Sequence, residues 1–67
     1  MIRVNIGQLV YIPSDTDLLQ YNKNSPIKVK HMKIPRNLIV LREDDKKLGV
    51  LFEGEVWYVD KNKVYSV

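Results

Sequence analysis

The stretch from Leu48 to Val67, LGVLFEGEVWYVDKNKVYSV, constrains the fold more than any other part of the chain. Its pattern predicts two strands joined by a tight turn, then a short polar connector and a last strand. We expect Gly54 and Glu55 to be the two turn residues, because Gly54 can supply the positive φ that a type II′ turn needs at its first central position. A hairpin of this kind needs further strands to bury its apolar side, so the earlier chain is expected to cover it.

This turn sets which side chains share a face of the sheet. Phe52 then lies opposite Trp57, and directly opposite residues point to the same side. The resulting face carries the only Phe and the only Trp of the chain, is wholly apolar, and consists of Val50, Phe52, Trp57 and Val59. The alternative is a turn at Glu53-Gly54, which places Phe52 opposite Glu55. The first register is favoured because it separates polar from apolar side chains, and we expect its apolar face to form the core.

The length and composition limit the chain to one domain, residues 1–67, without covalent cross-links. There are 67 residues and no cysteine, which excludes a disulfide and a Cys-based zinc site. A hydrophobic content of 45% with 28% charged residues favours a folded chain. No apolar run approaches the roughly 18 residues of a membrane span, and no secretory signal is visible, so a cytoplasmic setting is expected. A chain this short has a thin core, and forming a homodimer is one way to stabilise it, so a homodimer stays possible.

Upstream, the pattern predicts strands with one irregular segment between them. Residues Ile2 to Ile12 read as a strand that Pro13 ends, with a core face of Val4, Ile6, Gln8, Val10 and Ile12. Ser14 can cap a short helical turn carrying Leu18, Leu19 and Tyr21. Residues Ile27 to Ile34 alternate with lysines, which is typical of an edge strand. Asn37 to Glu43, NLIVLRE, is the clearest strand, so the chain is expected to be all-β.

The C-terminal stretch VLFEGEVWYVDKNKVYSV resembles the distal hairpin, the 3-10 turn and the closing strand of a Src-homology-3-like (SH3-like) barrel. In that resemblance the segment from Pro13 to Ile34 is the long loop after strand 1. The implied fold is a small β-barrel of about five to six strands, with a short 3-10 turn before the last strand. The aromatic residues that proline-rich peptide binders use have no counterparts here. The resemblance therefore points to the barrels of nucleic-acid-binding proteins and of small bacterial or phage accessory proteins. The Lys-, Asn- and Tyr-rich composition is also typical of a small phage protein.

Residues that could support catalysis or cofactor binding are sparse. His31 is the only histidine, which excludes a multi-His metal site and a Ser-His-Asp triad within one chain, and favours a surface role for this side chain. Asp44 and Asp45 lack the spacing of a calcium loop. The three glycines are too far apart to form a phosphate-binding loop. We therefore expect no enzyme activity, no metal and no cofactor.

The charge distribution gives one candidate binding segment. No acidic residue occurs between Leu18 and Arg42, while this segment contains Lys23, Lys28, Lys30, Lys33, Arg36 and Arg42. Clustered cations favour nucleic-acid phosphates through counterion release, and nearby tyrosines at positions 11, 21 and 58 could stack on bases. The simpler interpretation is a solvated, edge-protecting segment, and the formal net charge of only +3 agrees with it.

Apolar surface gives the second and favoured candidate. A barrel this small cannot bury both faces of every strand, and the residues expected to remain outside are Leu38, Val40, Leu51, Val56 and Tyr58. Contiguous exposed apolar area marks partner sites. The alternative is that the segment from Leu18 to Tyr21 seals this patch. We expect a non-enzymatic protein-interaction module that docks on another protein or on a second copy through an apolar-aromatic face with a basic rim. An accessory protein of a phage, acting on a host protein, is one such module.

Overall fold

The computed structural model describes the backbone of residues 4–22 and 25–67, and the side chains of this part except residues 22 and 25–27. In this part the chain forms one antiparallel sheet of seven strands, with the order β3-β2-β6-β5-β4-β1-β7. The elements are β1 (Leu9–Ile12), β2 (Thr16–Asn22), β3 (Ser25–Met32), β4 (Arg36–Glu43), β5 (Lys47–Phe52), β6 (Glu55–Asp60), the 3-10 helix η1 (Lys61–Lys63) and β7 (Tyr65–Ser66). The all-β class and the 3-10 turn before the last strand are confirmed.

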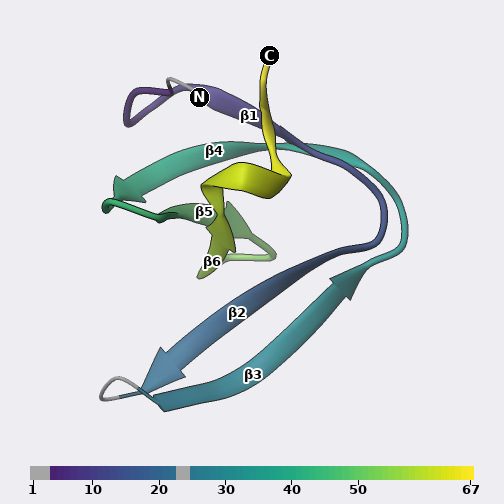
Figure 1. Ribbon diagram of the computed structural model, residues 1–67, viewed down its shortest axis with the longest axis vertical. Coiled ribbons are helices and arrows are strands. Elements are labelled where there is room, and N and C mark those ends of the chain that lie inside the picture. Colours follow the sequence, from purple (N-terminus) through teal and green to yellow (C-terminus); the bar gives the residue numbers. More distant parts are fainter. Residues whose placement is uncertain (1–3, 23–24) are drawn as a thin grey trace.

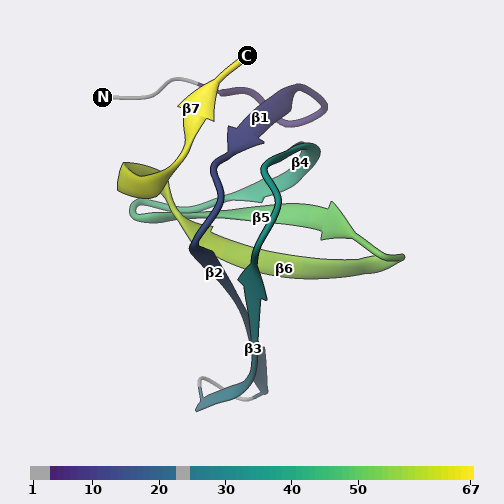
Figure 2. The ribbon, with the colours of Figure 1, turned by 90° about the vertical axis from the view of Figure 1, so that its right-hand side faces the viewer.

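The sheet curls but does not close into a barrel. Figure 1 shows β1 and β4 arching over the β5–β6 hairpin, with β2 and β3 continuing below. The two edges are β3 and the two-residue β7, and they are at opposite ends of the strand order. The β2–β3 hairpin meets β6 at the pair Leu19↔Tyr58, and its far end extends away from the β4–β6 meander (Figure 2). Because it extends in this direction, the hairpin does not complete a barrel wall.

The prediction of a long irregular loop after strand 1, with a helical turn at Leu18 to Tyr21, was wrong. The segment forms β2 and β3, which pair along their length. The separate prediction of an edge strand over residues 27–34 is confirmed by β3, which is one edge of the sheet. Asp15 has a positive φ of 65° and its backbone N–H donates to the Met32 carbonyl at 2.6 Å, which attaches the start of β2 to the end of β3. The helical pattern spanned only one turn, and a single turn is too short to persist against strand pairing.

The predicted register of the β5–β6 hairpin was also wrong, although the predicted core face was right. Glu53 and Gly54 form the turn with φ of 52° and 78°, which is the pair of positive values that a type I′ turn requires. Phe52 consequently lies opposite Glu55, and Trp57 opposite Val50. The two registers differ by two residues, and a shift of two leaves every side chain on the same face. Polarity therefore could not distinguish them, whereas turn geometry does.

The core fills the concave side of the curled sheet. Its buried apolar residues are Val4, Val10, Ile12, Leu18, Met32, Leu38, Val40, Leu48, Val50, Phe52, Trp57, Val59 and Val64. Every strand from β1 to β6 contributes, so no single hairpin is stable alone. The indole N–H of Trp57 is buried without a protein acceptor among the described residues.

The first predicted strand is shorter than expected. It begins at Leu9, because Gly7 has a φ of +94° and the preceding residues turn. The Gly7 N–H donates to the Val40 carbonyl at 2.7 Å, so this turn is still attached to β4. Ile6 is 64% exposed and Gln8 is exposed, so their prediction as core residues was wrong, while Val10 and Ile12 are fully buried. Met1 to Arg3 lie outside the described residues.

Candidate functional site

Two residues of the predicted apolar patch belong to the core. Leu38 is 9% exposed and Val40 is fully buried. Both side chains point to the concave side of β4, where Val40 lies opposite Val50. Their assignment to an exterior patch was wrong, because the sequence of β4 is apolar on both faces and gives no sign of which face is inside.

The other three residues of that patch lie on the convex face. Leu51 is 39% exposed and lies opposite Val56 on the neighbouring strand, which is half-buried. Tyr58 is half-buried and its ring lies over Gly49, since a Cβ built on Gly49 would be 3.2 Å from the Tyr58 Cε1 atom. A glycine at this position gives the ring room to lie flat on the sheet.

Two further apolar residues extend this patch across β4 and β1. Leu9 is 48% exposed and lies opposite the half-buried Ile39. Ile39 precedes Val40 and Leu51 follows Val50, so the antiparallel pairing of Val40 with Val50 places Ile39 and Leu51 side by side on the convex face. The result is a row across four adjacent strands, which we call the outer stripe and define as Leu9, Ile39, Leu51 and Val56. The alternation along β1, in which Val10 and Ile12 point inward, was a signal for an outward Leu9, whereas β4 is apolar on both faces and carries no such signal for Ile39.

Tyrosines flank the outer stripe on both sides. Tyr11 and Tyr65 pair across β1 and β7 with ring centroids 6.4 Å apart. On the other side Tyr21 meets Tyr58 edge to face at 5.8 Å. The alternative, in which the segment from Leu18 to Tyr21 seals the patch, holds only in part, because Tyr21 contacts Tyr58 while Leu51 remains exposed.

The predicted basic segment does not form one surface. Arg42 lies on the convex face, where its Cβ is 3.0 Å from the position a Gly49 Cβ would take. Lys23 lies outside the described residues, and Lys28 is exposed on β3. The other three cations, Lys30, Lys33 and Arg36, meet at one pocket between β3 and the start of β4.

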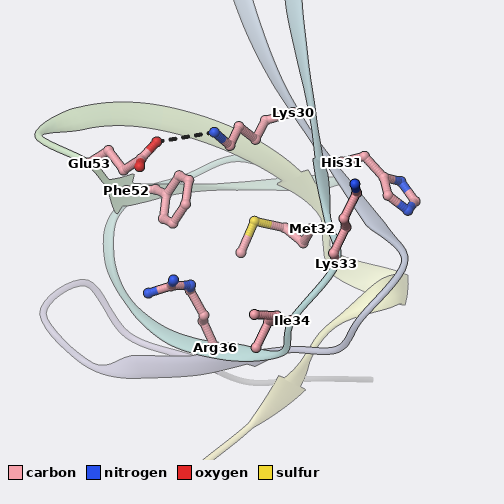
Figure 3. Close-up of a pocket in the computed structure, with 8 residues that line it drawn as sticks. All are labelled: Lys30, His31, Met32, Lys33, Ile34, Arg36, Phe52 and Glu53. Atoms are coloured by element: carbon pink, nitrogen blue, oxygen red, sulfur yellow. Dashed lines mark hydrogen bonds and ion pairs between the residues drawn. The ribbon is translucent and has the colours of Figure 1, made fainter.

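This pocket, which we call the cationic pocket, has a volume of about 320 Å³. Figure 3 shows its apolar floor and wall, made by Phe52, Met32 and Ile34. The Lys30 ammonium and the Arg36 guanidinium each lie 5.5 Å from the centroid of the Phe52 ring. Attraction to the ring helps hold both cations in place.

One carboxylate balances part of this charge. The Lys30 ammonium donates to Glu53 Oε1 at 3.3 Å. Lys33 and Arg36 have no ion-pair partner in the part of the chain that the structure describes. The tyrosines expected to stack on bases are not at this pocket, since Tyr11 contacts Tyr65, and Tyr21 and Tyr58 contact each other on the convex face.

His31, at the rim of the pocket, forms a pair of contacts with carboxylates of the β1–β2 turn and of β2. Its Nδ1 is 2.7 Å from Asp17 Oδ1 and its Nε2 is 3.1 Å from Asp15 Oδ1. A protonated imidazole can donate to both, and the bonds to Asp17 and then Asp15 raise the pKa of His31 above its ordinary value. Because each ring nitrogen faces a different carboxylate, this is an ion-pair bridge between β2 and β3. Among residues 4–22 and 25–67 no cluster of three or more His, Cys, Asp or Glu side chains could hold a metal.

Asp44 has a structural role in the β4–β5 turn. Its Oδ1 accepts the backbone N–H groups of Lys46 at 2.9 Å and Lys47 at 2.7 Å. These bonds, the one from Lys47 first, lower the pKa of Asp44. The carboxylate is therefore engaged in closing this turn.

Comparisons with protein families, with curated proteins and with solved structures found no match. In the described residues, no helix has the length and apolar character needed to cross a membrane. The candidate sites in the described part of the chain are the outer stripe and the cationic pocket.

Proposed function

We propose that this protein is a non-enzymatic protein-interaction module that docks on a protein partner through the outer stripe. The observation that carries the proposal is the set of aliphatic side chains on the convex face of β1, β4, β5 and β6, of which Leu9 is 48% and Leu51 39% exposed. Single exposed aliphatic residues are normal, but a contiguous row is the kind of surface that marks partner sites.

The surroundings of the outer stripe also suit a protein partner. Interface cores are enriched in tyrosine and depleted in charge, and the stripe has tyrosines on both sides. Arg42, which lies beside Gly49 on the same face, supplies a basic rim. A side chain that is now half-exposed, such as Leu51, gains up to about 1.5–3 kcal/mol when a partner buries it fully.

The fold that we propose for this module is an SH3-like barrel that is left open. Its support is the order of elements, in which β4, β5 and β6 form a meander, η1 follows, and β7 returns to pair with β1. The sequence resemblance was based on the same order. An origin in a phage, with a host protein as partner, stays a prediction.

The test compares Leu51→Asp and Leu9→Asp with Val29→Asp as a matched control. Val29 is 64% exposed on β3, away from the stripe, so this control places the same charge on an exposed apolar strand position. Each variant is first shown to be folded by circular dichroism. Self-association is then measured by sedimentation, and partners are captured from nuclease-treated lysate of the source cells.

We expect the two stripe variants to lose the complex, whether with a second copy or with another protein, and the control to keep it. A complex that survives both stripe substitutions unchanged refutes docking through this face. Loss of the complex in the Val29 variant alone would place the interface on β3.

A further inference from the structure

The cationic pocket is the second place where the described residues have unbalanced chemistry. Its lining carries Lys30, Lys33 and Arg36 against the single carboxylate of Glu53. His31 also lines it, but both of its ring nitrogens face Asp15 and Asp17. Two positive charges are therefore left without a partner carboxylate in the described part of the chain, at one concave site.

The geometry points to a phosphate-binding site, and we propose that the cationic pocket binds the phosphate group of a nucleotide. Arg36 is the main donor in this proposal. Its guanidinium is planar and always charged, and it can donate two parallel N–H bonds to a phosphate. The Phe52 ring, 5.5 Å away, restricts where the guanidinium lies before any ligand arrives, which lowers the entropy lost on binding.

The fold brings two cations to the Phe52 ring. Lys30 and Arg36 come from different strands, yet both lie 5.5 Å from the same ring centroid. Their repulsion is reduced on one side by Glu53, 3.3 Å from Lys30. A phosphate next to Arg36 would reduce it on the other side.

The size and the walls of the pocket favour an organic phosphate over inorganic phosphate as the ligand. A volume of about 320 Å³ is at the lower end of small-molecule sites and leaves room beyond one phosphate group. Met32, Phe52 and the 65% exposed side chain of Ile34 offer apolar contacts to the attached group.

The continuation of positive charge along β3 favours a nucleotide as the phosphate carrier. Lys28 is exposed two residues before Lys30 on the same edge strand. A single strand whose phosphate enters the pocket could place further phosphates beside Lys28, whereas a free nucleotide would use the pocket alone. The shared chemistry is the nucleotide phosphate, and the test separates these two sources.

The experiment is a titration of the ¹⁵N-labelled protein at low salt, followed by amide chemical shifts. Three probes are used: inorganic phosphate, thymidine monophosphate and a short single-stranded oligothymidylate. We expect the amides of Lys33, Arg36 and Phe52 to shift with both nucleotide probes, at affinities above that for inorganic phosphate. Tighter binding of the oligothymidylate with a steep salt dependence identifies a strand, and equal affinity for both identifies a free nucleotide; either result supports the site.

The variants are Arg36→Ala, Arg36→Lys and the control Lys63→Ala, which removes one exposed charge from η1 outside the pocket. Losing a bidentate bond to phosphate weakens binding by about tenfold or more, so Arg36→Ala should do this and Lys63→Ala should change affinity little. Arg36→Lys keeps the charge without the fork and should fall between them. If Arg36→Ala does not fold, Lys33→Ala replaces it with the same expectation.

Three results would overturn the proposal. One is the absence of any shift at the pocket with all three probes at low salt. Another is an equal loss of nucleotide affinity in the pocket variants and in Lys63→Ala, because this would show that the probes are attracted only by the overall positive charge. The third is binding of inorganic phosphate as tight as that of both nucleotide probes. The outer stripe is not part of this test, so either site can fail without the other.

Discussion

Replacing Gly49 by alanine tests how closely the convex face is packed. A Cβ at this position would lie 3.0 Å from the Arg42 Cβ, 3.2 Å from the Tyr58 Cε1 and 3.3 Å from the Val56 Cγ1. The Arg42 contact is the stiffest, because a Cβ moves only with its backbone. The aromatic ring of Tyr58 can give way by rotating.

Two opposing terms set the magnitude of the effect. Forcing an extra carbon into a packed site costs about 1–3 kcal/mol. The φ of Gly49 lies outside the left-handed region, so alanine is tolerated by the backbone and reduces the entropy of the unfolded chain by about 0.4–1 kcal/mol. We expect a net loss of about 1 kcal/mol, which lowers the Tm by about 4–8 °C in a chain of this size.

The assay is urea unfolding followed by the fluorescence of Trp57, the only tryptophan, which is 6% exposed in the folded state. The control is Gly54→Ala, where φ is +78° and nothing lies within 4 Å of the added carbon, so its cost is conformational alone. In a Tyr58→Ala background the cost of Gly49→Ala should fall by about 0.5 kcal/mol or more, while that of Gly54→Ala stays the same. An increase in stability on Gly49→Ala would show that the ring does not lie over the glycine.

Three further substitutions have expected outcomes of their own. The folded-state pKa of His31 is raised, so its contacts with Asp15 and Asp17 stabilise the protein below the unfolded pKa of 6.5. This contribution is lost as the pH rises through the folded pKa. His31→Gln should remove this pH dependence of the unfolding free energy, measured by urea unfolding across that range. The pKa of Asp44 is lowered, so its contribution to stability is present above the unfolded pKa of 3.8 and is lost as the pH falls through the folded pKa. Asp44→Asn should reduce this loss of unfolding free energy at acidic pH. An unchanged loss contradicts the role of Asp44 in the turn. Val50→Ala removes two buried methyl groups and should cost about 2 kcal/mol in the same unfolding assay, whereas a loss below about 0.5 kcal/mol would contradict its burial.

The inward-facing residues of β5 and β6 could be predicted from alternation, and the structure confirms them. Their register could not be predicted in the same way, because a shift of two residues preserves the polarity pattern. Glu53 before Gly54 was the missing information, since both adopt positive φ in the turn. Glutamate is an uncommon residue there, so the Glu53-Gly54 pair indicates a type I′ turn only weakly.

The β2–β3 hairpin and the face of β4 show a second limit. Leu18 and Tyr21 have a spacing that suits one helical turn as well as a strand, and only the contacts with β3 and β6 decide between them. In β4, Leu38 and Ile39 are equally apolar, and the inside face is decided by where β1 and β5 lie. A polarity pattern carries no information when both faces are apolar.

The cationic pocket was accessible in part from the sequence. The basic segment included Lys30, Lys33 and Arg36, but no pattern placed Phe52 among them. That contact joins β5 to the β3–β4 connection and depends on the curl of the sheet. Pockets formed by segments that are distant in the chain need the tertiary structure.

The two-residue turn of the β5–β6 hairpin has a consequence for the speed of folding. A hairpin closed by so short a turn forms in about 1–10 μs, whereas the pairing of Tyr11 with Tyr65 must wait until nearly the whole chain has been drawn together. We expect the transition state to contain the hairpin and to lack β7. Substitutions at Gly54 should then slow refolding, and substitutions in β7 should mainly accelerate unfolding.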